Sequence, residues 1–87
     1  MYYVYIVQCA DETLYTGIAT DLERRIDEHN HSDKGAKYTR ARRPVTLVYH
    51  ETFENRSAAS KREYEIKKRM SREDKLLLIN STDHISK

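Results

Sequence analysis

Two short segments rich in aromatic and β-branched residues open the chain and constrain its fold more than any other feature. The first covers residues 2–7 (YYVYIV) and the second covers residues 13–18 (TLYTGI), with Asp11 and Glu12 in the break between them. Residues of these types favour strands, and so short a break allows only an antiparallel pairing. The sequence therefore predicts a β-hairpin at the N-terminus.

A helix, an irregular segment and a third strand are expected next. Thr20, followed three residues later by Glu23, has the capping-box pattern that begins a helix, here over about residues 21–30. Residues 31–44 contain a Gly and the only Pro and lack apolar periodicity, so they are expected to form a loop or a short irregular turn. Residues 45–49 (VTLVY) predict the third strand.

Two further helices complete the predicted order ββαβαα. Ser57 is expected to cap one that ends near Met70, and Ser71 is expected to begin another that ends near Ile79. This order predicts an α/β fold, with a small three-stranded antiparallel sheet flanked by helices.

Composition favours one folded domain. Charged residues make up 34% of the chain, but the net charge is only +2 and the apolar residues occur in periodic clusters, which is typical of a folded chain. The domain is expected over residues 1–80, with the polar residues 81–87 as a flexible tail.

Cys9 is the only cysteine, which excludes an internal disulfide and suits a core position. The N-terminus lacks the pattern of a targeting or membrane-spanning segment, so we expect a cytoplasmic protein outside the membrane.

Charge is distributed unevenly along the chain. Residues 1–33 hold seven acids against two arginines, a balance of −5, whereas residues 34–87 hold fourteen bases against seven acids, a balance of +7. This arrangement allows the basic portion to bind a polyanion while carboxylates lie near a metal ion. A solvated surface of mixed charge is the simpler interpretation, and composition alone favours it.

Basic residues are most concentrated in residues 34–44 (KGAKYTRARRP), which contain no acid. Lysine and arginine neutralise phosphates, and an aromatic ring among them offers a surface for base stacking. The segment is therefore a candidate nucleic-acid contact, although a solvated loop fits the pattern equally well. The candidate residues are Lys34, Lys37, Tyr38, Arg40, Arg42 and Arg43.

Glu63 interrupts the apolar face of the expected helix that begins at Ser57. That face otherwise carries Ala59, Ile66 and Met70. A carboxylate there is costly unless it is paired or binds a metal ion. Helical spacing leaves both interpretations open, a metal ligand and an ion pair with Lys67 or a nearby arginine.

Leu22, Ile26 and His29 form one stripe on the first expected helix, and Arg25 flanks it. Arg25 is placed either to reach an anion or to cover the core with its apolar stem. A lone histidine such as His29 is more often a hydrogen-bonded packing residue than a catalyst.

Tyr5 and Tyr15 lie on the two strands of the expected hairpin and are placed to meet across it. Two phenols in this position are either core residues with hydrogen-bonded hydroxyls or groups that converge on a substrate oxygen.

Taken in order, these residues resemble the GIY-YIG nuclease superfamily. Residues 3–5 (YVY) and 15–17 (YTG) are similar to the paired strand motifs that give the superfamily its name, and Arg25, His29 and Glu63 follow at similar separations. The stretches AKYTR, RRPVTLVYHE and REYEIK resemble most the small stand-alone bacterial members, which are single domains. The resemblance covers almost the whole chain.

This resemblance implies endonuclease-type, metal-dependent hydrolysis of phosphodiester bonds, in DNA more than in RNA. Tyr5 and Tyr15 would lie at the reaction centre, and one of them or His29 would help to deprotonate the attacking water. Arg25 would steady the scissile phosphate, and Glu63 would hold one divalent cation, Mg²⁺ or Mn²⁺. Because free tyrosine titrates near ~10, a tyrosine base predicts a rate that rises with pH through the neutral-to-alkaline range.

The chain departs from the family's motifs at several positions. Tyr3 stands at the first Gly of the first motif, Thr16 at the middle Ile of the second, and Ile18 where some repair-enzyme relatives carry Lys. No clear match exists to the Asn that some homing enzymes place after the acidic helix. Two alternatives to a nuclease therefore stay open, a nucleic-acid-binding module with weak or lost nuclease activity and a protein-interaction domain. A partner protein is a candidate source of specificity, and the oligomeric state is open.

Overall fold

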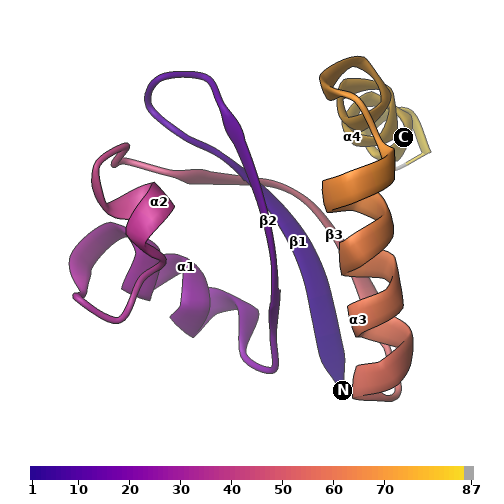
Figure 1. Ribbon diagram of the computed structural model, residues 1–87, viewed down its shortest axis with the longest axis horizontal. Coiled ribbons are helices and arrows are strands. Elements are labelled where there is room, and N and C mark those ends of the chain that lie inside the picture. Colours follow the sequence, from indigo (N-terminus) through magenta and orange to yellow (C-terminus); the bar gives the residue numbers. More distant parts are fainter. Residues whose placement is uncertain (86–87) are drawn as a thin grey trace.

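The fold is a three-stranded antiparallel sheet flanked by helices, as the sequence predicts (Figure 1). The computed structural model describes residues 1–85, with side chains through residue 81. The strand order is β2-β1-β3, so the first strand is central and pairs with both others. The strands are β1 (Tyr2–Gln8), β2 (Leu14–Ala19) and β3 (Thr46–Phe53).

The helices divide between the two faces of the sheet. One pair lies on one side, and the remaining helical segments lie on the other (Figure 1). The first side holds α1 (Leu22–His31) and α2 (Lys37–Arg40). The second side holds α3 (Arg56–Tyr64), the π-helical turn η1 (Glu65–Arg69) and α4 (Arg72–Ile85).

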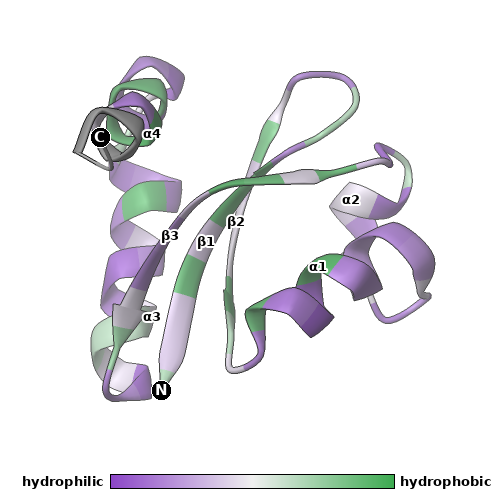
Figure 2. Ribbon diagram, turned by 180° about the vertical axis from the view of Figure 1, so that it is seen from behind, coloured by the Kyte–Doolittle hydropathy of each residue, from purple (hydrophilic) through white to green (hydrophobic). Residues whose placement is uncertain are grey.

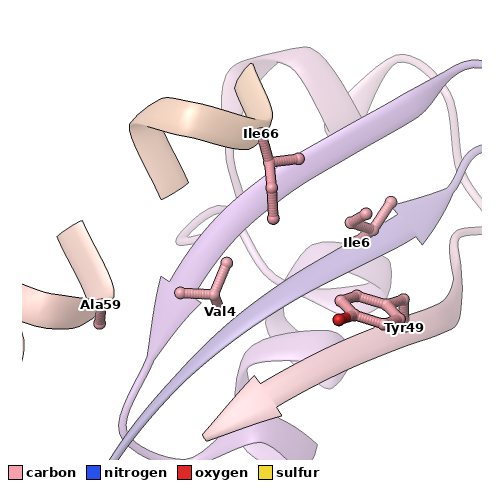
Figure 3. Packing of buried hydrophobic residues seen from close by; sticks show 5 residues of the cluster. All are labelled: Val4, Ile6, Tyr49, Ala59 and Ile66. Carbon is pink, nitrogen blue, oxygen red and sulfur yellow. The ribbon is translucent and has the colours of Figure 1, made fainter. Parts of the chain in front are cut away.

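Alternate residues of β1 supply the centre of two separate apolar clusters, because successive side chains of a strand point to opposite faces. Val4 and Ile6 lie fully buried on the α3 side, where Tyr49, Ala59 and Ile66 pack around them (Figure 3). Burying an isoleucine completely contributes about 1.5–3 kcal/mol. The predicted inward positions Ala59 and Ile66 are therefore confirmed.

The opposite cluster lies under α1. It consists of Tyr5, Val7, Cys9 and Val45, with Leu22 and Ile26 of α1 packed against it. Cys9 is only 4% exposed, which confirms its expected core position. This cluster holds α1 against the sheet and places the next turn of that helix beside Tyr5.

Two helices begin at residues other than those expected. α1 is capped by Asp21 and not by Thr20, and α3 is capped by Asn55 and not by Ser57. In each case the side-chain oxygen accepts a hydrogen bond from the backbone N–H three residues on, at 3.1 and 2.8 Å. Aspartate and asparagine are stronger caps than threonine, and both residues stand in extended backbone immediately before the helix. The predicted start at Ser71 is confirmed by its reciprocal bonds with Asp74.

Three boundaries also differ from the predictions. β3 continues from the expected end at Tyr49 to Phe53, because an edge strand tolerates polar residues that face solvent. The segment 31–44 includes the single helical turn α2. α4 runs past Ile79 to Ile85, so the predicted tail begins inside a helix, and residues 86 and 87 lie outside the described residues.

Hydropathy follows the layers of the fold (Figure 2). Apolar residues concentrate in the strands, whereas the helices are largely hydrophilic with apolar residues at intervals. None of the helices in residues 1–85 is long and apolar enough to cross a membrane.

Replacing Thr16 by valine is expected to stabilise the fold. Thr16 is 3% exposed, and within the described part of the chain its Oγ1 has no hydrogen-bond partner. A buried polar group without a partner costs about 1–3 kcal/mol, and valine has nearly the same shape. We expect the free energy of unfolding, measured in urea, to rise by about 1 kcal/mol. Thr39→Val removes a hydroxyl that is hydrogen-bonded and should instead lower this free energy. A Thr16→Val protein less stable than the wild type would contradict the prediction.

Candidate active site

Gly17 makes room for the ring of Tyr5. The two residues face each other across β1 and β2, and Tyr5 is only 1% exposed. A Cβ atom on residue 17 would lie 2.4 Å from the Tyr5 hydroxyl oxygen and 2.6 Å from its Cζ. A glycine is therefore required where the phenol passes over β2 toward α1.

The Tyr5 hydroxyl ends at His29, the buried histidine of α1. Its oxygen lies 2.6 Å from Nε2 of His29, and Nδ1 of the same ring lies 2.8 Å from Oγ1 of Thr39. Thr39 donates its own hydroxyl hydrogen to the carbonyl oxygen of Ala36 at 2.9 Å. With this donation, Nδ1–H of His29 is assigned to donate to Thr39, which leaves Nε2 to accept the hydrogen of Tyr5. The backbone N–H of Ala36 also donates toward Nδ1, at 3.4 Å, and favours the opposite tautomer; we give priority to the shorter contact with Thr39.

Burial holds both members of this pair in their neutral forms. It raises the pKa of Tyr5 to about 12, although the neighbouring Arg25 guanidinium favours the phenolate. Burial, assisted by the charge of Arg25, lowers the pKa of His29 to about 4. At neutral pH the proton therefore resides on Tyr5 and faces an unprotonated nitrogen.

The neutral His29 predicts a loss of stability in mild acid. Histidine in an unfolded chain titrates near ~6.5, whereas His29 in the folded protein titrates at about 4. Between these values the unfolded chain binds a proton that the folded chain does not, so stability falls as pH decreases from about 6.5 to 4. The loss from this group reaches about 3 kcal/mol at pH 4.

Urea denaturation of the wild type and His29→Gln at pH 7 and pH 4 measures this contribution. The wild type is expected to lose more stability than the variant by that amount. His31→Gln is the control, because His31 lies on the same helix with a side chain 74% exposed. Equal pH dependence in the wild type and His29→Gln would contradict the assignment.

Tyr15 lies between the buried His29 and the more exposed Tyr38. Its ring meets the His29 ring edge-on, with centroids 5.5 Å apart, and stacks on Tyr38 at 5.8 Å and 23°. The Arg42 guanidinium lies 3.9 Å from the Tyr38 ring centroid. These side chains form an aromatic and cationic surface beside the buried Tyr5.

Arg25 approaches the Tyr5 phenol from α1. Its guanidinium acts to lower the pKa of that phenol, against the larger effect of burial. One guanidinium nitrogen also donates to Glu28 at 3.0 Å and to the carbonyl oxygen of Lys34 at 2.9 Å. The side chain is 27% exposed. Arg25 is thus held in place and still accessible to an anion.

Glu63 approaches from α3, on the other side of β2. Its charge acts to raise the pKa of Tyr5, after the larger effect of burial. It pairs with Lys67, one turn along the helix, at 3.3 Å, as one of the sequence-based interpretations anticipated. The Lys67 ammonium lies 5.4 Å from the Tyr15 ring centroid. The Glu63 side chain is 25% exposed and remains accessible from solvent.

The donor set at Glu63 suits a hydrated cation. Within residues 1–81, no three or more His, Cys, Asp or Glu side chains are grouped to enclose a metal ion. Mg²⁺ does not need such a cage, since it retains several waters and is commonly bound by one or two carboxylates and by substrate phosphates. A single accessible carboxylate fits a hydrated Mg²⁺ or Mn²⁺ and does not fit an enclosed zinc site.

The basic segment 34–44 divides into outward and inward side chains. Tyr38 and Arg42 belong to the stack on Tyr15, and Arg42 is further paired with Asp11 at 3.0 Å. The exposed cations of the segment are Lys34, Lys37 and Arg40.

Arg43 differs from the other candidates in this segment. Its Nε donates to the carbonyl oxygen of His29 at 2.5 Å, and its terminal nitrogen donates to the carbonyl oxygen of Ser32. These carbonyls belong to the end of α1, where a cation is favourable. Arg43 therefore holds the segment against α1. The sequence groups it with Lys34, Lys37 and Arg40 as a candidate nucleic-acid contact, but unlike them it is only partly exposed and its guanidinium bonds to backbone carbonyls.

The sequence does not predict how Thr39 and Lys67 contribute to the site. Thr39 orients His29, but it lies in a segment without apolar periodicity, so no pattern indicates that it is buried. Its only signal is the AKYTR stretch that resembles the family. Lys67 was anticipated as a partner of Glu63, whereas its position beside Tyr15 required the structure.

Comparison with known proteins shows the family to which this chain belongs. The model of the GIY-YIG catalytic domain family matches residues 1–76. A UPF0213 protein of Desulfotalea psychrophila is 71% identical over 66 residues, which cover 76% of this chain and 60% of the relative. A UPF0213 protein of Haloquadratum walsbyi is 55% identical over 82 residues, which cover 94% of this chain and 91% of the relative.

Two solved structures share the fold. The solution NMR structure of a UPF0213 protein from Bacillus halodurans has a TM-score of 0.58 and 47% identity, and covers 92% of this chain and 84% of its own. The solution NMR structure of an E. faecalis protein has a TM-score of 0.63 and 40% identity, and covers 94% of this chain and 85% of its own. The chain therefore belongs to the GIY-YIG family, a family of nuclease type, and its relatives are the small single-domain UPF0213 proteins.

Proposed function

We propose that this protein is a metal-dependent endonuclease that hydrolyses phosphodiester bonds in DNA. The observation that carries the proposal is the convergence of Tyr5, Tyr15, Arg25, His29 and Glu63 around the edge strand β2. They come from β1, β2, α1 and α3, so only the folded chain brings them together. Phosphodiester hydrolysis needs a proton acceptor, a cation for the phosphate and a carboxylate for a metal ion, and these residues supply all three.

Tyr5 is the general base in this proposal, and His29 receives the proton from it. As the water oxygen bonds to phosphorus, the water proton passes to the Tyr5 oxygen and the phenolic proton passes to Nε2 of His29. The bond from phosphorus to the leaving oxygen breaks, and that oxygen takes a proton from solvent. The bond from Nδ1–H to Thr39 keeps Nε2 directed at Tyr5 throughout. A phosphate bound at Arg25 adds negative charge nearby and so favours the protonated ring.

Arg25 and Glu63 act on the phosphate. The planar guanidinium of Arg25 donates to non-bridging oxygens and stabilises the charge that develops on them. Glu63 would hold one divalent cation, Mg²⁺ or Mn²⁺. When bound, that cation supplies positive charge for the phosphate and the leaving oxygen. Tyr15 and Tyr38 would line the path of the strand, with stacking surfaces for bases.

The second candidate function is a nucleic-acid-binding module with weak or lost nuclease activity. It is favoured by the pairing of Glu63 with Lys67, which competes with a cation, and by the exposed cations around α2. Binding to those cations needs no chemistry at Tyr5.

Cleavage assays on a panel of substrates distinguish the two functions. The panel consists of labelled single-stranded, duplex and branched DNA, and an RNA of the same sequence, each with Mg²⁺, Mn²⁺ or EDTA. A nuclease cuts at least one DNA with metal and none in EDTA. Binding that falls steeply with salt, without cleavage of any substrate under either metal, would favour the binding module.

A further inference from the structure

A cleft of about 340 Å³ lies at the end of β2 where α1 begins. The starts of β1, α1 and α3 all lie at this end of the molecule (Figures 1 and 2). The first residue of α3, Arg56, therefore lines the same cleft as Arg24 and Arg25 of α1. Residues more than thirty positions apart in the sequence thus present three guanidinium groups to one space.

The arginines in this cleft exceed what its carboxylates neutralise. Glu28 is shared between Arg25, at 3.0 Å, and Arg24, at 3.4 Å. The other carboxylate, Asp21, caps α1 and makes no ion pair within residues 1–81, so three guanidinium groups face two carboxylates. Among the described residues, the side chain of Arg56 makes no hydrogen bond or ion pair. The cleft therefore retains unpaired guanidinium donors, which suit the oxygens of a phosphate.

Arg25 connects this cleft to the catalytic residues. It lines the cleft and also acts on the Tyr5 phenol. Tyr15, near the start of β2, carries the aromatic stack, whereas Ala19, at its end, lines the cleft. These two residues are four positions apart, which spans roughly 13 Å in a strand. A nucleic-acid strand that follows the edge of β2 would pass the stack, the catalytic residues and the cleft in turn.

We propose that Arg24 and Arg56, in the cleft beside Arg25, bind a phosphate of the substrate strand other than the scissile one, which Arg25 contacts. This proposal rests on the proposed nuclease function for the identity of the substrate. The cleft fixes the position of the strand along β2, so that the scissile phosphate is presented to Tyr5. Glu28 is a positioning residue in this arrangement, because its carboxylate holds the guanidinium groups of Arg24 and Arg25.

A phosphate scan combined with Arg56→Gln tests the cleft. The probe is a set of labelled single-stranded DNA oligonucleotides, each with one phosphate replaced by a neutral methylphosphonate, and binding is measured in EDTA. Arg56→Gln is expected to weaken binding of the unmodified strand about 10-fold and to reduce the slope of log K against log salt by about 0.7. At one phosphate position, the methylphosphonate should weaken binding to the wild type clearly more than binding to Arg56→Gln, which has already lost one of the contacts to that phosphate. Lys61→Gln, an exposed lysine on the same helix, is the matched control and should change affinity less than about 2-fold.

The outcomes separate this proposal from the nuclease proposal. If every methylphosphonate has the same effect on the wild type and on Arg56→Gln, or if Lys61→Gln loses as much affinity, the cleft is not a phosphate site. The same holds if the sensitive phosphate proves to be the one that is cut in Mg²⁺. Because binding is measured in EDTA, absence of cleavage would overturn the nuclease and leave the phosphate site standing. Thermal unfolding of each variant confirms that the fold is retained.

Discussion

Replacing Glu63 by glutamine is expected to abolish metal-dependent cleavage and to leave the fold intact. The substitution preserves the shape of the side chain and removes the charge that would hold the cation. A cation at the phosphate is worth several kcal/mol in such reactions, so the single-turnover rate should fall about a thousand-fold or more. Glu63 is partly exposed and pairs with one lysine, so the free energy of unfolding should change by less than about 1 kcal/mol.

Glu65→Gln is the matched control for this experiment. Glu65 lies two positions along the chain and pairs with Arg62 at 2.5 Å, away from Tyr5. Its variant should cleave at nearly the wild-type rate. Nearly full activity in Glu63→Gln would show that Glu63 is not the metal ligand. Its role would then be structural, as the partner of Lys67 in an ion pair.

Replacing Tyr5 by phenylalanine is expected to slow cleavage about 10²–10⁴-fold with little change in DNA affinity. The substitution removes only the hydroxyl group, which is buried and directed at His29. Single-turnover cleavage and equilibrium binding measure the two effects separately. Tyr15→Phe distinguishes the roles of the two tyrosines. The Tyr15 hydroxyl makes no hydrogen bond within the described residues, so its removal should slow cleavage less than removal of the Tyr5 hydroxyl. A Tyr5→Phe protein with the wild-type rate would exclude Tyr5 as the base.

The pH profile tests the role of His29 in the same step. Since His29 is neutral above its pKa of about 4, a relay through it predicts a wild-type rate that is level at neutral pH and falls as pH approaches 4. This differs from the alkaline rise expected for a tyrosine alone. In His29→Gln, Tyr5 must lose its proton to solvent, so the rate should be lower and should rise with pH toward the Tyr5 pKa of about 12. A wild-type rate that already rises tenfold per pH unit at neutral pH would contradict the relay.

The elements with strong periodicity were predictable from the sequence. Two segments of β-branched and aromatic residues with a short break between them specify the hairpin, and the third strand has the same character. The alternation of β1 also placed Tyr5 and Val4 on opposite faces, as the structure confirms. Helix starts were less predictable, because Thr20 and Asp21 are adjacent residues of which either can cap a helix, and the path of the preceding strand decides between them.

Much of the site depends on contacts between residues distant in sequence. Spacing identified His29 but left its role open, since its function follows from Tyr5 on one side and Thr39 on the other. Helical periodicity marks Glu63 as anomalous, and only the structure shows that its partner Lys67 lies beside Tyr15. In the sequence, Arg43 cannot be told apart from the exposed Arg40 of the same basic segment. Only the structure shows that it bonds to carbonyl oxygens at the end of α1.

Metal-dependent cleavage at Glu63 is tested most directly with one labelled DNA substrate, incubated with the wild-type protein in Mg²⁺ and in EDTA, beside Glu63→Gln. We expect cutting by the wild type in Mg²⁺ alone, and none above background by the variant. Cutting that persists in EDTA, or equal cutting by both folded proteins in Mg²⁺, would contradict a metal-dependent nuclease centred on Glu63 and Tyr5.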